Sequence, residues 1–493
     1  MRVDGYNEII KICQDMSNEL NLYFIARIQS RKDLAVHVNN GNIEEITTGN
    51  LEGLGIQVFN SQGYMGFAAS DQISTKIAID LFKKATFLAQ QSQRFQAEHT
   101  LEFKKLTSLK DRIEVKTELA AESLSLNQIE TKMKEVNQEV IAIDSRLSVR
   151  SLFRLTDEEW RVFRADGTDV IFNTPRSLLF HSITAKEDNR TASAYANLPG
   201  IDLTVLTAQD NLARLQKRAA KAARLALDLL SAPKIQGGNY KLVIDYALAK
   251  GLAHEAFGHA VETDGLESSI LGDAGRLKTG IMVAGSKLSI IDGPIEGDYA
   301  YQPISAVGIK RRTVRIVDHG QLMGGLADIY SASKAGVSIT GAERVESFFH
   351  LPIARMSNIR IEYEDPIPVT QDFESITAAQ LYYILNQNNL IKPGETVLYL
   401  TGFQGGQVNP AFGDFVFHCS GIYQLAEEPV LYQPAIFSGK ILSVLKSVSA
   451  AIGPPQIDAI GTCGKMGQSV PSCGGSHYFL VIDSNPEAII GGV

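Results

Sequence analysis

The residues best suited to chemistry lie in one short, otherwise apolar segment, 254–264, which reads HEAFGHAVETD. Its two histidines, His254 and His259, are five residues apart, and Glu255 directly follows the first. In the common zinc-protease pattern HExxH, two histidines at i and i+4 share one helix face and bind the metal, while the glutamate acts as general base. The same residue types here indicate metal-assisted hydrolysis, although the spacing is one residue longer.

The longer spacing makes a demand on the backbone. On an ideal α-helix, residues i and i+5 point about 140° apart, which is too far for two imidazoles to share one small cation. A π-helical turn of about 4.4 residues would bring them within about 50° of each other, and such turns are frequent at functional sites. We therefore predict a π-type bulge, kink or early unwinding between His254 and His259, with Gly258 placed to permit it. The alternative is two unrelated buried histidines, each bonded to a backbone carbonyl.

A catalytic zinc site also needs a third protein ligand and an open position for water. Glu262 and Asp264 crowd the same short segment, where carboxylates are costly to bury without a cation. The residues leave the third ligand open among Glu262, Asp264, Cys419, Cys463 and Cys473. Cys463 lies in the glycine-rich stretch 461–467, GTCGKMG, whose backbone can approach another element closely and present one side chain. Cys13, Cys419 and Cys473 are more typical of small buried hydrophobic residues.

The hydrophobic pattern predicts the elements that must position these side chains. Residues 240–245 (YKLVID) are typical of a short buried strand, and a helix over 246–262 follows it. Residues 275–440 carry a glycine about every ten residues and many Val, Ile, Tyr and Phe, which indicates many strands and turns. Helices are expected again at 378–388 and 443–451.

The first half of the chain predicts hairpins and helices. Turn signals divide residues 34–69 into antiparallel hairpins; they are 39–41, Gly53, Gly55 and 61–63. Apolar periodicity and composition predict helices, over 71–92, 126–140 and 208–230. The last of these ends before Pro233, so we place a domain boundary there. We expect an N-terminal region, 1–232, divisible into 1–110 and 111–232, and a strand-rich metal-binding domain, 233–493. The fold class is α+β with antiparallel or mixed sheets.

Composition excludes several classes of protein. The 493 residues carry a net charge of −8, which gives no support for binding nucleic acid or an anionic membrane surface. The sequence contains no apolar run of about 18 residues, so no membrane-spanning helix is expected. Four cysteines cannot form a disulfide framework in so long a chain, and they fit a reducing compartment. With no signal peptide in the first thirty residues, we expect the cytoplasm.

Four blocks of the sequence resemble one known family. HEAFGHAVETD (254–264), LPIARMSN (351–358), GGQVNPAFGDF (405–415) and GTCGKMGQSVP (461–471) occur in the order found in the TldD/PmbA metalloproteases. The resemblance spans nearly the whole chain and is to the active, TldD-like branch. It implies that His254, His259 and Cys463 hold Zn²⁺ and that Glu255 is the catalytic base. It also implies extended, unfolded peptides as substrates and a dimer, either with itself or with a TldE-like subunit.

The chain departs from the family pattern after Pro471, where Cys473 and His477 bring in two more side chains that could reach a metal. We therefore expect a zinc-dependent metalloprotease that uses a metal-activated water, with Glu255 passing the proton to the leaving amine. Arg355 is a candidate donor to the oxyanion or, equally, part of a structural ion pair. The alternatives are a zinc hydrolase of a small amide and a non-catalytic subunit of a complex.

Overall fold

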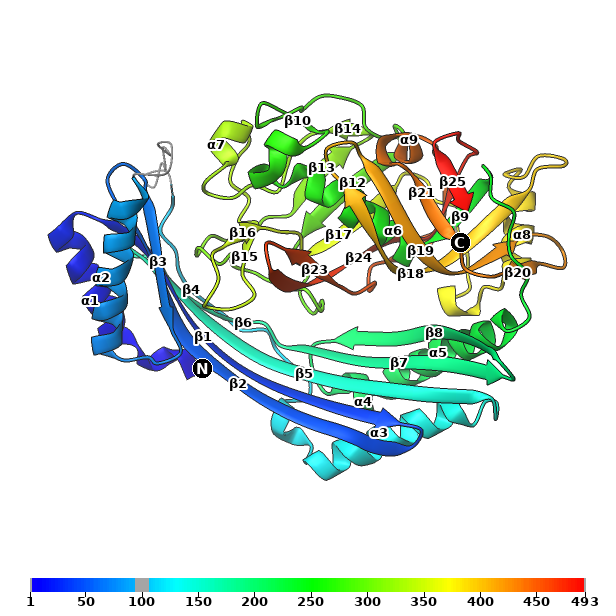
Figure 1. The fold of residues 1–493 in the computed structure, drawn as a ribbon, viewed down its shortest axis with the longest axis horizontal. Helices are drawn as coiled ribbons and strands as arrows, with labels where there is room; N and C mark the ends of the chain where they lie inside the picture. Colours follow the sequence, from blue (N-terminus) through cyan, green and yellow to red (C-terminus); the bar gives the residue numbers. More distant parts are fainter. Residues whose placement is uncertain (1, 94–105, 492–493) are drawn as a thin grey trace.

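The computed structural model describes residues 2–93 and 106–491. Its strands form two large sheets, an eight-stranded one in the first half of the chain and a thirteen-stranded one in the second (Figure 1). The predicted α+β class with mixed sheets is confirmed. In the ranges described, no helix combines the length and the apolar character needed to cross a membrane.

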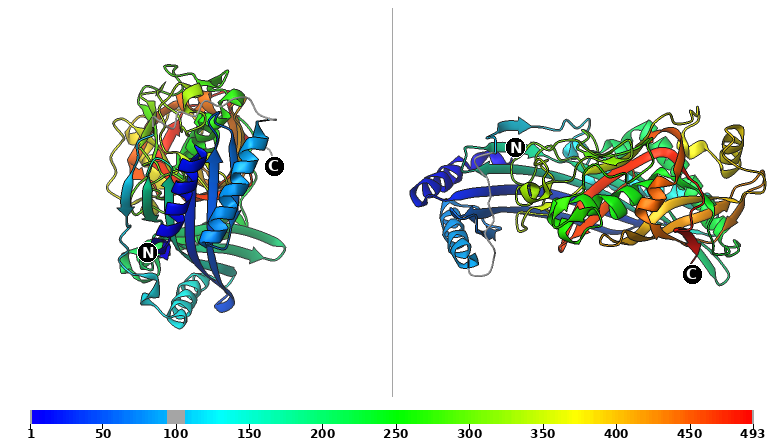
Figure 2. Two further views of the ribbon diagram at one scale, coloured as in Figure 1. Left: turned by 90° about the vertical axis from the view of Figure 1, so that its left-hand side faces the viewer. Right: turned by 90° about the horizontal axis from the view of Figure 1, so that it is seen from above.

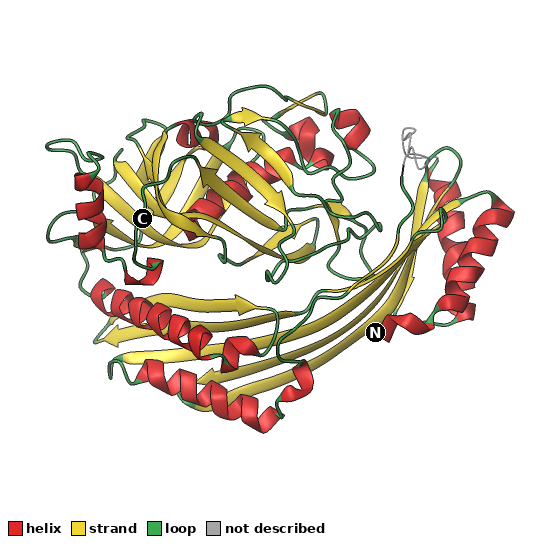
Figure 3. Cartoon of the chain, turned by 180° about the vertical axis from the view of Figure 1, so that it is seen from behind, coloured by secondary structure: helices red, strands yellow, loops and turns green. Residues whose placement is uncertain are grey.

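The N-terminal sheet is long and strongly curved, as Figures 1 and 3 show. Its path is β3-β2-β1-β5-β6-β4, and β7 and β8 extend it beside β5. The strands are β1 (Tyr23–Asn39), β2 (Asn42–Phe59), β3 (Met65–Ser70), β4 (Lys110–Ile113), β5 (Leu147–Arg164), β6 (Asp169–Asn173), β7 (Arg176–Glu187) and β8 (Arg190–Gly200). The turn predicted between the first two strands is present, and Asn40 and Gly41 adopt the positive φ values of 46° and 80° that such a turn needs.

Strand alternation divides the residues of this sheet between its two faces. Even-numbered residues of β1, such as Phe24 and Val36, face helices on the outer side, whereas odd-numbered ones such as Ile25 face the C-terminal half. The outer helices are α1 (Asn7–Leu20), α2 (Thr75–Ser92), α3 (Leu126–Ile141), α4 (Thr204–Thr207) and α5 (Gln209–Leu229). The three long helices predicted in this half are thus present as α2, α3 and α5.

The C-terminal sheet surrounds the segment that carries the histidines. Its path is β14-β13-β12-β17-β24-β9-β18-β19-β21-β25, with β20 beside β19 and with β22 and β23 beside β24. The strands are β9 (Lys241–Asp245), β12 (Leu288–Gly293), β13 (Val314–Asp318), β14 (Gln321–Leu322), β17 (Asn358–Tyr363), β18 (Val397–Asn409), β19 (Asp414–Gln424), β20 (Val430–Tyr432), β21 (Ile436–Lys440), β22 (Val448–Gln456), β23 (Gly461–Lys465), β24 (Gln468–Ile482) and β25 (Ala488–Gly491). Two short pairs lie outside it, β10 (Gly272–Asp273) with β11 (Arg276–Leu277) and β15 (Glu343–Arg344) with β16 (Ile353–Ala354).

Helices in the C-terminal half are short. They include α6 (Tyr246–Gly251), α7 (Ala332–Ala335), α8 (Ala378–Gln387) and α9 (Ile441–Lys446). The helix predicted over 378–388 is present as α8. The helix predicted over 443–451 is wrong in its second half, because α9 ends at Lys446 and Val448 begins β22, which pairs with β24. Val448 and Ala451 are buried in that sheet, so tertiary pairing overrides their helical pattern.

The C-terminal half sits against the inner face of the curved sheet (Figures 1 and 2). Residues of the loop after β15 make the contact: Phe348 N donates to Gln29 Oε1, and Arg27 Nη2 donates to the carbonyl of His350. Gly53, predicted as a turn, instead lies inside β2, and a Cβ on it would lie 2.1 Å from the Phe348 ring. Gly55 is likewise within β2 and lies against the Phe348 carbonyl. These glycines admit a neighbouring segment and do not mark turns.

Candidate metal centre

The histidine segment begins at the carboxyl end of a buried strand. Asp245, the last residue of β9, accepts hydrogen bonds from the backbone N–H groups of Ala247 and Leu248 and so caps α6. After Gly251 the helix widens into the π-helix η4 (Leu252–Gly258) and then tightens into the 3₁₀ turn η5 (His259–Val261). The π-type turn predicted from the five-residue spacing is therefore confirmed.

Gly258 has a different role from the one predicted. Its φ and ψ of −57° and −48° are ordinary helical values, so the π-helix does not need its conformational freedom. Instead, a Cβ on Gly258 would lie 2.0 Å from Met356 Sδ. The glycine makes room for the chain segment that follows β16.

The wide turn brings three potential ligands together. One ligand atom from each of His254, His259 and Cys463 lies within 4.8 Å of the others. Cys463 Sγ is 3.6 Å from His259 Nε2, and the two imidazole rings are nearly perpendicular, at 87°. The carboxylate of Glu255 lies 4.0 Å from His254 Nε2 and 3.9 Å from His259 Nε2. All four residues named by the family resemblance thus meet at one place.

Cys463 comes from the tight hairpin β23–β24, where it pairs with Val470. The hairpin turns at Met466 and Gly467, both with positive φ. Arg355 is fully buried and donates to the backbone carbonyls of Cys463 and Gln468, so it holds the hairpin closed. Its Nη1 and Nη2 donors are used within the protein, which favours a structural role, but through backbone carbonyls and not through the ion pair given as the alternative.

Two residues near these potential ligands have contacts that the sequence did not predict. Glu262 Oε2 accepts a hydrogen bond from His259 Nδ1 at 2.9 Å, which leaves Nε2 to face Cys463. Lys465 Nζ then contacts Glu262 at 2.8 Å and Asp264 at 2.7 Å. The sequence spacing could have indicated both contacts. Residues 463 and 465 lie on the same face of one strand, and Glu262 is three residues after His259.

The other cysteines and His477 have separate surroundings. Cys419 Sγ donates to the carbonyl of Ala435, and Cys473 Sγ donates to that of Ile457. His477 is bonded on both ring nitrogens, to the Gly453 carbonyl and the Tyr363 backbone N–H. Cys13 is buried beneath the N-terminal helices. Within residues 2–93 and 106–491, His254, His259 and Cys463 form the one group with metal-site geometry.

Electrostatics in the cluster favour metal ligation. Burial lowers the pKa of His254 well below its usual value, so this imidazole is neutral and keeps a free lone pair. Burial also acts to lower the pKa of His259, but the Glu262 carboxylate and the Cys463 thiol outweigh it and raise this pKa to about 10. For Cys463, burial acts to raise the pKa, yet the contact with His259 prevails and lowers it. Without a metal, the imidazolium and thiolate stabilise each other, and a cation would replace the proton.

A zinc ion fits these donors. Both ring nitrogens of His254 are buried without a hydrogen-bond partner, an arrangement that a cation would relieve. Nitrogen and sulfur ligands of a tetrahedral zinc ion, at about 2.05 and 2.3 Å, lie about 3.6 Å apart, which matches the distance between His259 and Cys463. Two imidazoles and one thiolate are typical zinc ligands, and three protein ligands leave a position open for water.

Family models match the chain in two places: the PmbA/TldA metallopeptidase C-terminal domain over residues 237–468 and PmbA/TldA metallopeptidase domain 1 over residues 26–89. The chain belongs to the TldD/PmbA family of metallopeptidases. A metalloprotease of Archaeoglobus fulgidus is 30% identical over 327 residues, 66% of this chain and 67% of that protein. One from Methanocaldococcus jannaschii is 26% identical over 92% of this chain and 94% of its own length. A TldD homologue of Haemophilus influenzae is 29% identical over 75% of this chain and 74% of its own length.

Solved structures of this family share the fold. TldE from Thermococcus kodakarensis superposes with a TM-score of 0.73 at 15% identity, covering 98% of this chain and 99% of its own. A protein of Bacteroides thetaiotaomicron, described as a proposed modulator of DNA gyrase, gives the same TM-score at 18% identity, with both chains covered completely. The family predicted from the four sequence blocks is thereby confirmed, and the enzyme class is metallopeptidase.

Proposed function

We propose that this TldD/PmbA metallopeptidase depends on zinc and hydrolyses peptide bonds in unfolded peptides or small proteins. The observation that carries the proposal is the meeting of two imidazoles and a thiol within 4.8 Å, with the Glu255 carboxylate beside them. His254, His259 and Cys463 would hold the ion. When bound, zinc polarises the scissile carbonyl and lowers the pKa of a water molecule.

The remaining chemistry belongs to the chain itself. Glu255 is the acidic residue whose carboxylate stands close to both histidine rings, and its side chain is 25% exposed. It can therefore take a proton from a water in the open position and later donate it to the leaving amine. Glu262 fixes the tautomer of His259 from the opposite side of the ring, at 2.9 Å, and is too deeply buried, at 1% exposure, to meet the substrate.

Burial of the cluster supports unfolded substrates. His254 and Cys463 are at most 1% exposed, and the His259 side chain is 14% exposed. A peptide bond within a folded protein cannot approach donors at this depth, whereas an extended chain can. The complete ligand set also favours a catalytic role over that of a non-catalytic subunit.

Assembly and location are part of the same proposal. We expect a dimer of this chain or a complex with a TldE-like subunit, because a TldE structure has the same overall fold. We place the protein in the cytoplasm, since its four cysteines are all free thiols and all buried.

The substitution Glu255→Gln tests the general base. It should keep stoichiometric zinc, measured by atomic absorption after gel filtration, because the ligands are unchanged. Hydrolysis of an unfolded peptide should fall by at least about 100-fold, the usual contribution of acid–base catalysis. Glu267→Gln, at a side chain that is 68% exposed and pairs with Lys334, is the matched control and should retain activity.

The substrate class is tested in the same assay. Wild-type protein, alone and with a TldE-like subunit, should cleave the unfolded peptide and leave a stably folded protein intact. Cleavage of small amides in preference to peptides would contradict the proposed substrate, and near wild-type activity of Glu255→Gln would contradict the proposed base.

A further inference from the structure

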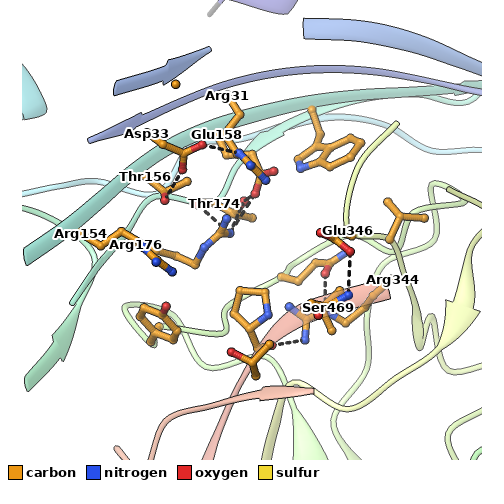
Figure 4. Close-up of a pocket in the computed structure, with 18 of the residues that line it drawn as sticks. Arg31, Asp33, Arg154, Thr156, Glu158, Thr174, Arg176, Arg344, Glu346 and Ser469 are labelled. Carbon is orange, nitrogen blue, oxygen red and sulfur yellow. Dashed lines mark hydrogen bonds and ion pairs between the residues drawn. The ribbon is translucent and has the colours of Figure 1, made fainter. Parts of the chain in front are cut away.

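A second site candidate lies between the two halves of the molecule, in a cavity of about 440 Å³. Figure 4 shows side chains of the curved sheet on one side and Arg344, Glu346 and Ser469 of the C-terminal half on the other. The volume is within the range of small-ligand sites, which is about 300–1,000 Å³. The proposed catalytic reaction uses none of these residues.

Strand register explains why one wall of the cavity is charged. Arg31 pairs with Glu158 across β1 and β5, and Asp33 pairs with Thr156 two residues further along. Because successive side chains alternate, these residues and Arg154 share the inner face of the sheet. Thr156 also pairs with Arg176 of β7, which adds a further guanidinium to the same face. The inner face of the sheet therefore presents a row of charged and polar side chains to the C-terminal half at this place.

The charges in this cavity do not balance. Four arginines and three carboxylates line it. Arg31 pairs with Asp33 at 2.8 Å and Arg176 pairs with Glu158 at 2.9 Å, so these four charges are compensated. Among the residues that the structure describes, the side chain of Arg154, which is exposed to solvent, makes no hydrogen bond or ion pair.

Arg344 is the second arginine without an ion pair, although the Cys463 and Asp298 side chains act on it electrostatically. It is 4% exposed, and its donors reach only neutral acceptors, namely Gln302 Oε1 and the carbonyls of Met356 and Pro471. No carboxylate of the described chain forms an ion pair with it. Glu346, the remaining acid, accepts the backbone N–H of Ser469 instead. A buried guanidinium beside a cavity is costly unless an anion completes the pairing.

The cavity is separate from the metal centre, although one hairpin borders both. Thr462 and Ser469 of β23–β24 line the cavity from one face of the hairpin, whereas Cys463 lies on the alternate face and turns toward the histidines. Arg344 contacts the Pro471 carbonyl of this hairpin, so a ligand in the cavity would lie behind the strand that supplies the thiolate.

We propose that this cavity binds the C-terminal carboxylate of a short peptide. Guanidinium groups match the planar carboxylate, and Arg154 and Arg344 provide the unpaired charge. Aromatic side chains at the same cavity, Trp160, Tyr299 and Tyr301, offer surface to the residues before the carboxylate. The choice of a peptide as the carrier of the carboxylate rests on the proposed peptidase function. The demand for an anion rests on Arg344, which is buried without an ion pair, and the exposed Arg154 adds a second free guanidinium.

The chain contains its own reporter for this site. Trp160 is the single tryptophan, and it lines the cavity, so its fluorescence emission reports directly on occupancy. Two full-length samples are prepared: the zinc-loaded Glu255→Gln variant and protein from which a chelator has removed the metal. Each is titrated with a tetrapeptide that has a free C-terminal carboxylate. Parallel titrations use the same peptide as its C-terminal amide and inorganic phosphate.

The free acid should change the emission saturably, and removal of the metal should leave its Kd unchanged. Amidation of the peptide, or Arg154→Gln in the protein, should weaken binding by about tenfold or more, as expected for a charged hydrogen bond. Arg315→Gln, at an exposed arginine of β13, is the matched control and should bind as wild type. Glu346→Gln keeps an acceptor for Ser469 but removes a negative charge, so it should bind at least as tightly.

Equal binding of acid and amide, or wild-type affinity in Arg154→Gln, would overturn the proposal. Loss of binding after chelation would place the peptide at the metal centre instead. Phosphate binding as tight as that of the peptide would make this a general anion site and overturn the peptide assignment. The zinc-free protein cannot hydrolyse peptides by the proposed mechanism, so this binding measurement does not depend on catalysis. It would remain valid even if the proposed function were wrong.

Discussion

Two of the three proposed ligands, His259 and Cys463, are held in place by neighbouring residues, whereas both ring nitrogens of His254 lack a hydrogen-bond partner. Glu262 orients His259, Lys465 neutralises Glu262, and Arg355 secures the backbone of Cys463. Because Lys465 shares a strand with Cys463, its ion pairs with Glu262 and Asp264 tie the hairpin to the histidine segment. Such outer contacts fix ligand direction and raise ligand basicity. The site is thus prepared for a cation by residues that would not touch it.

Substitution of the cysteines tests which thiol is a ligand. Loss of a residue that only hydrogen-bonds a ligand weakens metal binding by up to about 100-fold. Cys463→Ser removes a thiolate donor itself, so it should weaken zinc binding by more than about 100-fold. Cys473→Ser, Cys419→Ser and His477→Ala should keep wild-type affinity, since their side chains are bonded elsewhere. Competition with a chromogenic chelator measures each Kd. If Cys473→Ser empties the site and Cys463→Ser does not, the assigned hairpin position is wrong.

The raised pKa of Glu343 predicts that the stability of the fold depends on pH. Burial, followed by the nearby Asp328 carboxylate, raises its pKa from 4.5 to about 7, and its Oε2 has no partner. Between these pH values the folded chain binds one more proton than the unfolded chain, so the free energy of unfolding falls as the pH rises through this window. Glu343→Gln removes this titration. The free energy of unfolding of this variant, measured with urea and taken relative to wild type, should therefore rise by about 3 kcal/mol from pH 4 to pH 8. Parallel pH profiles of the two proteins would refute the expectation.

Among the elements, the π-helix η4 was predictable because chemistry constrains it. Two histidines at i and i+5 can share an ion only if the turn widens, so the sequence spacing alone contains the information. The role of Gly258 was not predictable in the same way. The atom it avoids, Met356 Sδ, lies almost a hundred residues away in the chain. Local sequence predicts backbone geometry here, whereas the space that a side chain needs depends on the assembled fold.

Gly258→Ala tests this steric account. The added methyl group meets Met356 Sδ at 2.0 Å in a buried place, and it should destabilise the fold by about 1–3 kcal/mol, as overpacking usually does. Because the backbone there is ordinary helix, the substitution should cause no conformational strain. Gly265→Ala is the matched control, since a Cβ there has nothing within 4 Å. Equal unfolding free energies in urea for the two variants would show that the contact relaxes without cost.

The strands and helices that the sequence misassigned share one physical cause. Residues 448–451 have a helical pattern, yet β24 offers them a partner with which their backbone forms a ladder. Gly53 and Gly55 resemble turn residues, yet Phe348 and its carbonyl occupy the space that side chains would need. In each case a distant segment decides the local structure. By contrast α3, whose apolar residues repeat every three or four positions and whose first residue follows a capping box at Ser125, is specified locally.

At the scale of the whole molecule, the inner face of the curved sheet joins the two halves of the chain. Apolar residues of β5 and β6, such as Trp160 and Val170, pack with Ile304 and Val307 of the C-terminal half. Beside this cluster, Arg27 and Gln29 hydrogen-bond the loop that carries Phe348. The domain boundary predicted near residue 232 stays a prediction. It falls between α5 and β9, after which the chain enters the second large sheet.

Gly53→Ala should loosen this junction. A methyl group at Gly53 would lie 2.1 Å from the Phe348 ring, which is fully buried and cannot swing into solvent without losing its contacts. We expect a loss of about 1–3 kcal/mol in the free energy of unfolding, together with a red shift of Trp160 emission as the packed face opens. Gly49→Ala is the control, because it lies on the same face of β2 and its Cβ would meet Asp33 at an ordinary 3.7 Å. If both variants unfold alike and Trp160 emission is unchanged, Phe348 does not secure the two halves, and the hydrogen bonds of Arg27 and Gln29 would have to carry the junction.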